Sequence, residues 1–407
     1  MPLHDRPRMK PHFFALSLIG LGAFFGVALI QIGFLAALGM VAGAQRWRHV
    51  DRRLLAIVFL FGGLAMSHSV FGQEPVAAPD YLLRWRYLLL LPLVPALMSP
   101  MTAQRLLGGF VLLAGLSGLY GVAQVMTESP GWLGFLHPEG SVKPLWRYAW
   151  SPENQRWMRA GIKATGTIHN IAAFAHVTML ILLWPLAYGL LSRRRIPAWH
   201  LLAGLLALAG LSLSGARAAW LGLGAGAFVL IVCRWRPRWL RAVTFALVLV
   251  IGGLGVSLLK SPVLQQKAGS LTGRTQIWDQ CLKTTTQTGL MGLGYGAHAG
   301  YASKIYPQTP GLETKVKTWC HHVPLSLVVE APLTIIPAAM LLVFLLLALT
   351  RSDPRPLQGF ALASILAFWT ISQLHDPHFQ REFFPFAMLL IGCGLIRREV
   401  TNESDAS

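Results

Sequence analysis

Long apolar runs separated by short basic connections dominate the pattern of this chain. The runs are continuous, not alternating, and about 20 residues suffice for a helix to cross the roughly 30 Å hydrocarbon core of a bilayer. Because lipid offers the backbone no hydrogen-bond partners, such runs predict transmembrane helices. We expect about twelve, at residues 13–29, 31–44, 54–71, 83–98, 106–126, 167–191, 198–213, 218–232, 243–259, 324–349, 357–371 and 383–396.

Two longer polar stretches interrupt these runs. The pattern therefore predicts an all-α polytopic membrane protein, one integral membrane domain over residues 1–407, with extended periplasmic segments at 127–165 and 260–322. Arginines cluster in the connections on the side that would hold both termini, which makes that side cytoplasmic. The polar end, 399–407, is expected to be a disordered cytoplasmic tail.

Composition excludes an ordinary soluble protein. Hydrophobic residues make up 54% of the chain, charged residues only 13%, and the mean hydropathy is +0.53. The net charge of +19 does not predict nucleic-acid binding, because most of these cations lie in connections between spans and report topology. The outward segments nevertheless keep an excess of cations, which suits either a polyanionic partner or anionic lipid headgroups. They include Lys143, Arg147, Arg156, Arg159, Lys163, Lys267, Lys283, Lys304, Lys315 and Lys317.

The four cysteines divide by location. Cys233 and Cys393 fall in or at the ends of predicted spans, where inert thiols are expected. Cys281 and Cys320 share the large outward loop and can pair if that compartment is oxidising. The sequence does not give the distance between them, so both states stay open.

Polar clusters stand at the outward starts of three predicted spans. They are residues 165–170, residues 214–217 and residues 321–324. A helix start presents free N–H groups and the positive end of the helix dipole, so a cation beside it makes an anion site. Arg217 has this position, and its guanidinium can donate two hydrogen bonds to phosphate oxygens.

Snorkelling to lipid phosphates is the alternative for such arginines. It is the weaker alternative for Arg217 and slightly favoured for Arg84 and Arg86, at the outer end of the predicted span 83–98. Arg274 precedes a glycine-rich stretch, residues 289–296, which would let the chain turn tightly and approach a ligand. That stretch is no nucleotide-binding fingerprint, because no strand precedes it.

The adjacent His321 and His322 are the candidates for acid–base chemistry. A neutral imidazole can accept a proton from a hydroxyl near pH 7, and a position at the junction of loop and span would place it between a membrane-borne donor and an extramembrane acceptor. Metal binding by the outward histidines is not supported by paired ligand spacing, so we expect no metal and no cofactor. Those histidines are His298, His321, His322, His375 and His378.

Four segments, taken in order, resemble the O-antigen ligase family of bacterial envelope glycosyltransferases, a superfamily that also includes O-antigen polymerases and pilin-glycosylating ligases. Residues 159–173 resemble the family's Arg…Gly-Thr…Asn…Ala entry into a span. Residues 214–221 resemble its Ser-x-x-Arg…Trp segment, and residues 273–294 its Arg…Trp…Gly-x-Gly loop. Residues 321–332 resemble its histidine segment, with His322 in an amide or hydroxyl position and Pro332 where glycine is usual.

The resemblance implies transfer of a glycan from undecaprenyl pyrophosphate to the lipid A–core oligosaccharide, at the periplasmic face of the bacterial inner membrane. It implies His321 as general base, with His322 the alternative, and Arg217 and Arg274 as cations that stabilise the pyrophosphate. The substrate-binding residues that we expect are Arg84, Arg86, Arg159, Lys163, Asn170 and His322. The expected partners are the carrier-linked glycan, the lipid A–core acceptor and membrane lipids.

Three other functions compete with this one. A polymerase or a pilin-type oligosaccharyltransferase would share the donor machinery, and acceptor specificity would lie in variable loops. A transporter also suits twelve spans, but its ionisable residues would mark a pathway near the membrane midplane. In this chain the candidate Arg and His residues gather at one face, and no pair of matching broken spans is visible.

Overall fold

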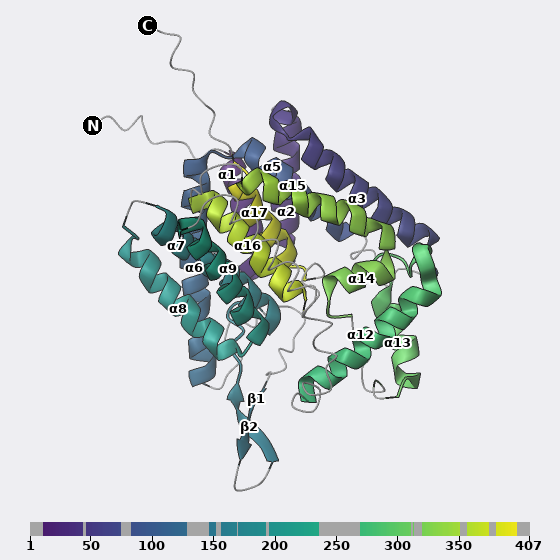
Figure 1. Cartoon of the computed structure of the whole chain (residues 1–407). Helices are drawn as coiled ribbons and strands as arrows, with labels where there is room; N and C mark the ends of the chain where they lie inside the picture. Colours follow the sequence, from purple (N-terminus) through teal and green to yellow (C-terminus); the bar gives the residue numbers. More distant parts are fainter. Residues whose placement is uncertain are drawn as a thin grey trace, which may run out of the picture.

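Apolar helices that run between two ends of the molecule make up most of the described residues in this computed structural model (Figure 1). The structure describes residues 11–43, 46–74, 83–127, 146–151, 156–168, 170–192, 195–235, 269–310, 312, 320–350, 356–373 and 380–396. The expected span 243–259 and the expected tail 399–407 lie outside these residues.

The main helices follow the predicted apolar runs closely. They are α1 (Pro11–Phe25), α2 (Val27–Gly43), α3 (Arg52–Phe71), α5 (Leu90–Leu97), α6 (Pro100–Met126), α7 (Ile171–Leu191), α8 (Ala198–Ser214), α9 (Arg217–Trp235), α15 (Ile335–Thr350), α16 (Pro356–Ser372) and α17 (Phe383–Gly394). Among the described residues, five helical stretches are long and apolar enough to cross a membrane: Arg52–Phe71, Pro100–Met126, Ile171–Leu191, Arg217–Arg234 and Pro332–Thr350. The count of twelve spans stays a prediction.

Three span boundaries differ from the expected ones. α1 and α2 separate at Gly26, whose φ of 142° is open to glycine alone. The expected span 83–98 is a 3₁₀ helix, η3 (Leu83–Leu89), followed by the short α5, which contains Pro95. The expected span 324–349 is broken into α14 (Val323–Glu330), η7 (Pro332–Thr334) and α15, because Ala331 leaves the helical region and Pro332 follows.

Small residues let the helices pack closely. At the α6–α8 crossing, a Cβ on Gly210 would lie 2.6 Å from the Cα of Gly118, so the two backbones touch directly. Close approach through small residues is typical of helix pairs in membranes, where the lipid removes most of the hydrophobic drive to associate. α9 packs along α16 and α7, and α17 packs against α5 and α16.

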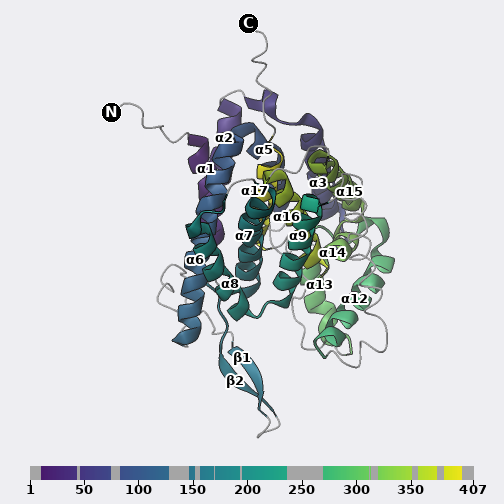
Figure 2. The ribbon, with the colours of Figure 1, turned by 60° about the vertical axis from the view of Figure 1, so that its left-hand side comes forward.

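The described parts of the predicted outward segments contain regular secondary structure, which the sequence did not predict. A hairpin of β1 (Trp146–Ser151) and β2 (Arg156–Ile162) projects from the bundle, so the all-α prediction missed a two-stranded antiparallel sheet. The hairpin lies at the same end of the bundle as α12 (Gly269–Thr288) and α13 (His298–Ile305), which we call the hairpin end (Figures 1 and 2).

The large outward loop forms a small helical unit with its own apolar core. Besides α12 and α13 it contains the 3₁₀ turns η5 (Gly289–Met291) and η6 (Tyr306–Gln308). Outside this loop, the 3₁₀ turn η2 (Arg46–His49) connects α2 to α3. Trp278, Tyr306 and Leu312 are buried in that core together with Leu325 and Val329 of α14. Burial of this apolar area stabilises the helical unit.

Candidate active site

Arg217 opens α9 directly after a tight turn at the hairpin end. α8 ends at Ser214, and Gly215 takes a left-handed φ of 68°, which glycine adopts without strain. The buried Ser214 hydroxyl accepts a hydrogen bond from the Ala216 N–H at 3.2 Å. Arg217 is thereby an exposed cation at a helix N-terminus, as the sequence predicted.

Lys163 lies beside the same turn. Its Cε is 3.9 Å from the position that a Cβ on Gly215 would take. The neighbouring Ala164 N–H donates to the Leu213 carbonyl at 3.2 Å, which holds this segment against the end of α8. The structure therefore brings Lys163 and Arg217, two predicted site residues about 50 positions apart in the sequence, into one small area.

The Thr-Gly-Thr segment before α7 is anchored to α6. The Gln124 side chain accepts from the Thr165 N–H at 3.1 Å and donates to the Gly166 carbonyl at 3.3 Å. The Ser117 hydroxyl accepts from the Thr167 N–H at 3.0 Å. These buried bonds fix the entry of α7, a role that the sequence did not reveal because Ser117 and Gln124 lie on another helix.

Asn170 caps α7. Its side-chain oxygen accepts from Ala172 N at 2.8 Å and from Ala173 N at 3.2 Å, which satisfies two otherwise free donors. The capping bonds account for an asparagine at this position without any substrate contact. The predicted contact of Asn170 with substrate stays a prediction. Arg159 is described only by its backbone in β2, which pairs with Tyr148.

One face of α12 points at the histidine segment. Arg274, Trp278 and Cys281 follow one another at helical spacings of four and three, so they share a face. The Trp278 ring lies edge-on to the His322 ring at 6.0 Å between centroids, and Cys281 is disulfide-bonded to Cys320. The helix that carries Arg274 is therefore joined to the residue preceding His321, and the pairing that the sequence left open is made.

The two histidines have different surroundings. His321 is half-buried, and its φ is 54°. No other described non-glycine residue has a positive φ, so the chain turns sharply at His321. His322 is buried and caps α14, because its Nδ1 accepts from the Leu325 N–H at 3.1 Å. An Nδ1 that accepts carries no proton, so neutral His322 holds its proton on Nε2. His322 is thus arranged as a donor at Nε2.

The sequence missed Gln373, which follows α16. Burial lowers the pKa of His322 to about 4, and the nearby Gln373 amide and the backbone oppose this only in part. His322 Nε2 and Gln373 Oε1 are both buried without a hydrogen-bond partner within 3.5 Å among the described residues. The His322 Nε2–H donor and the Gln373 Oε1 acceptor could bond to each other after a small movement, or both could bond to a polar group that lies between them.

The glycine-rich stretch, residues 289–296, lies in space between α3 and α14 and is hydrogen-bonded to both; we call it the glycine-rich linker. His68 Nδ1 bonds the Met291 carbonyl at 2.8 Å, and the Leu293 N–H donates to the Val329 carbonyl at 2.9 Å. At Gly292 φ is 64°, and a Cβ there would meet the Glu330 carbonyl. The predicted tight turn is confirmed, whereas close approach to a ligand stays a prediction.

Glu330 holds this linker to α13. The carboxylate is fully buried and accepts from Gly296 N and His298 N, each at 3.1 Å. An anion is favourable there because these N–H groups open α13. Burial and the nearby Glu330 charge raise the pKa of Tyr295, and Arg84 opposes them.

Arg84 therefore belongs to a buried polar group with Tyr295 and Glu330. Its side chain is buried, so the slightly favoured assignment to lipid headgroups is wrong for this residue. The guanidinium carbon of Arg86 lies 5.0 Å from the Tyr87 ring centroid, and Arg86 Nη2 donates to the Tyr87 hydroxyl at 3.2 Å. Whether either arginine binds substrate stays a prediction.

Two of the predicted outward cations are already paired. Lys304 Nζ lies 2.6 Å from Glu74, and Lys283 Nζ lies 3.0 Å from Asp279. They offer less positive charge to a polyanion than the sequence suggested.

Six of the predicted residues thus fall into two groups at the hairpin end. Lys163, Asn170 and Arg217 lie where α7 and α9 begin. Arg274 lies on α12, whose Trp278 contacts His322, one of the two histidines that precede α14. α16 packs against both α7 and α9, and Gln373 at its end lies beside His322. α16 is therefore the element that connects the groups.

A bundle of apolar helices with cations and histidines gathered at one end defines a multi-pass membrane protein with a polar site at the end of its helices. Residues 202–331 match the family described as O-antigen ligase. This match runs from α8 to Ala331, includes Arg217, Arg274 and both histidines, and supports a relation to that family of glycosyltransferase-like enzymes. No curated protein matches the chain.

Proposed function

We propose that this protein is an O-antigen ligase. It transfers a glycan from undecaprenyl pyrophosphate to the lipid A–core oligosaccharide at the periplasmic face of the bacterial inner membrane. Its termini are cytoplasmic, and the hairpin end faces the periplasm. The observation that supports the proposal is the junction of α12 with the histidine segment, through the disulfide and the Trp278–His322 contact, because it brings the helix that carries Arg274 against the segment that carries both histidines.

Arg217 and Arg274 stabilise the leaving pyrophosphate. Negative charge grows on the carrier as the glycosidic bond breaks, and fixed guanidinium groups oppose it most strongly where water is excluded. Burial lowers the pKa of Arg274 from its usual value, which reflects partial removal from water. An arginine remains charged near neutrality even so, and a less hydrated charge acts more strongly on a phosphate.

His321 is the general base in this scheme. The acceptor sugar hydroxyl must lose a proton as it attacks, and a neutral imidazole nitrogen within hydrogen-bond reach can take it. His322 is less suited, because its Nδ1 is engaged by Leu325 and its Nε2 bears the proton. His322 instead donates a hydrogen bond to substrate or to Gln373.

Purified protein with carrier-linked glycan and core acceptor in detergent tests the proposal. His321→Ala should abolish transfer, and His322→Asn, which keeps a capping side chain, should retain part of it. Full activity of His321→Ala would assign the base to another residue. Loss of activity with a chelator and recovery with a divalent ion would refute a metal-free reaction.

The acceptor decides between ligation and polymerisation. A deletion strain that loses all capped core but keeps carrier-linked polymer supports a ligase, whereas a strain with a single repeat on the core has lost a polymerase. Transfer in detergent, with no sealed compartment, also excludes a transporter as the source of the activity.

A further inference from the structure

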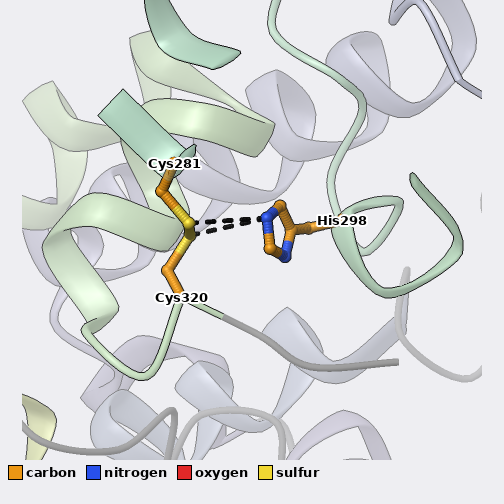
Figure 3. A group of neighbouring side chains, drawn as sticks. All are labelled: Cys281, His298 and Cys320. Carbon is orange, nitrogen blue, oxygen red and sulfur yellow. Dashed lines mark hydrogen bonds between the residues drawn. A yellow bond between two sulfur atoms is a disulfide. The ribbon is translucent and has the colours of Figure 1, made fainter. Parts of the chain in front are cut away.

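A cluster of sulfur and nitrogen ligands lies beside the candidate active site. Cys281 of α12, His298 of α13 and Cys320 are all buried, and their ligand atoms lie within 4.8 Å of one another (Figure 3). His298 Nε2 faces both sulfurs, at 3.5 Å from Cys281 and 3.7 Å from Cys320. The cluster contains none of the residues assigned above to the reaction.

These separations are those of a tetrahedral zinc site. With Zn–S near 2.3 Å and Zn–N near 2.0 Å, a tetrahedron has S···N edges of roughly 3.6 Å and an S···S edge of roughly 3.8 Å. Both S···N distances in the structure already fit. Only the two sulfurs, which are bonded to each other here, must move apart.

A candidate for a fourth ligand atom lies beside the cluster. The Tyr306 hydroxyl lies 3.4 Å from His298 Nε2 and 3.9 Å from the Cys281 sulfur. This oxygen is close enough to two of the three ligand atoms to complete the set, and Tyr306 is fully buried. A closed, buried set of two cysteines, one histidine and one oxygen suits a structural metal ion more than a catalytic one, which needs an open position.

We propose that Cys281, His298 and Cys320, with Tyr306 at the fourth corner, form a site for a thiophilic divalent cation such as Zn²⁺ when the disulfide is reduced. A dithiol reductant supplies two electrons and two protons, the disulfide becomes two thiols, and the reductant becomes a disulfide. The cation then displaces the two thiol protons and binds both thiolates. In either state α12 stays joined to the segment before His321, by a covalent bond or through the metal.

Cobalt binding tests this site without any measurement of glycosyl transfer. Full-length protein with Cys233→Ser and Cys393→Ser, which removes the other two thiols, is reduced with dithiothreitol, desalted without oxygen and titrated with Co²⁺. The reduced protein should bind one equivalent and show a thiolate-to-cobalt charge-transfer band that Zn²⁺ abolishes. The oxidised protein should show no band.

Ligand variants complete the test. Cys320→Ser should lose the band, and His298→Ala should weaken cobalt binding by roughly 100-fold, since a structural zinc site shares its binding energy among four ligands. His68→Ala, a change at another buried histidine of the same end, is the matched control and should bind as the parent does. Reduced parent protein that keeps its melting temperature but binds no cobalt, or unchanged binding in His298→Ala, overturns the proposal.

Discussion

The Glu330 carboxylate should be the main anchor of the glycine-rich linker. It is fully buried and accepts two backbone hydrogen bonds, from Gly296 N and His298 N. Hydrogen bonds to a charged group contribute about 1.5–3 kcal/mol each, so Glu330→Ala should cost roughly 3–6 kcal/mol of local stability. Glu330→Gln, which keeps one acceptor oxygen, should cost about half as much.

Hydrogen–deuterium exchange measures this loss directly. A local cost of about 3 kcal/mol corresponds to roughly 150-fold faster exchange where opening controls it. The increase should appear at Gly296, His298 and the following turn of α13. Glu74→Gln is the matched control: it breaks the ion pair with Lys304, whose side chain is 61% exposed, and should cost less than about 1 kcal/mol.

Unchanged exchange in Glu330→Ala would refute this reasoning. It would mean that the linker is held by its backbone bonds to Val329 and Glu330, so that the carboxylate had been assigned the wrong role. Faster exchange over the whole protein, in place of a local change, would also contradict a local anchor.

Three further predictions concern the site. Burial lowers the pKa of His322 to about 4, so between pH 6.5 and about 4 the unfolded state binds more protons than the folded state. The free energy of unfolding should therefore fall by roughly 3 kcal/mol as the pH drops through that window. In His322→Asn the melting temperature should depend less on pH over the same range. Asn170→Ala should cost about 1 kcal/mol by loss of the α7 cap while Asn170→Asp restores stability, and reduced transfer in a stable Asn170→Asp would indicate substrate contact instead. Arg217→Lys and Arg274→Lys should recover part of the transfer lost in the alanine variants, since a lysine keeps the charge but not the two-pronged geometry; equal rates for lysine and alanine would contradict charge stabilisation.

Much of the fold follows from local sequence. The apolar runs predicted where α3, α6, α7, α8, α16 and α17 lie, because a helix in lipid must be apolar along its length, and a short window of sequence shows this. The start of α9 at Arg217 was readable for the same reason. The breaks at Gly26 and Ala331 were missed, because a continuous apolar run does not show where its helix changes direction.

The site depended more on tertiary contacts. The motifs named Arg217, Arg274 and His321, but no spacing in the sequence could place α12 against the histidine segment, since residues 281 and 320 meet only through folding. Gln373 was invisible for the same reason: it reaches His322 from another helix.

The sequence alone determined that this chain enters a membrane, which residues could meet a phosphate, and the order of the family's motifs. Only the tertiary structure decided that the outward loop is a folded helical unit, that Asn170, His322 and Glu330 hold backbone N–H groups, and that His298 faces two sulfurs. The physical reason is the distance in sequence over which each interaction acts. Burial in lipid acts on each residue where it stands, whereas caps, buried acceptors and ligand clusters need partners brought together by packing.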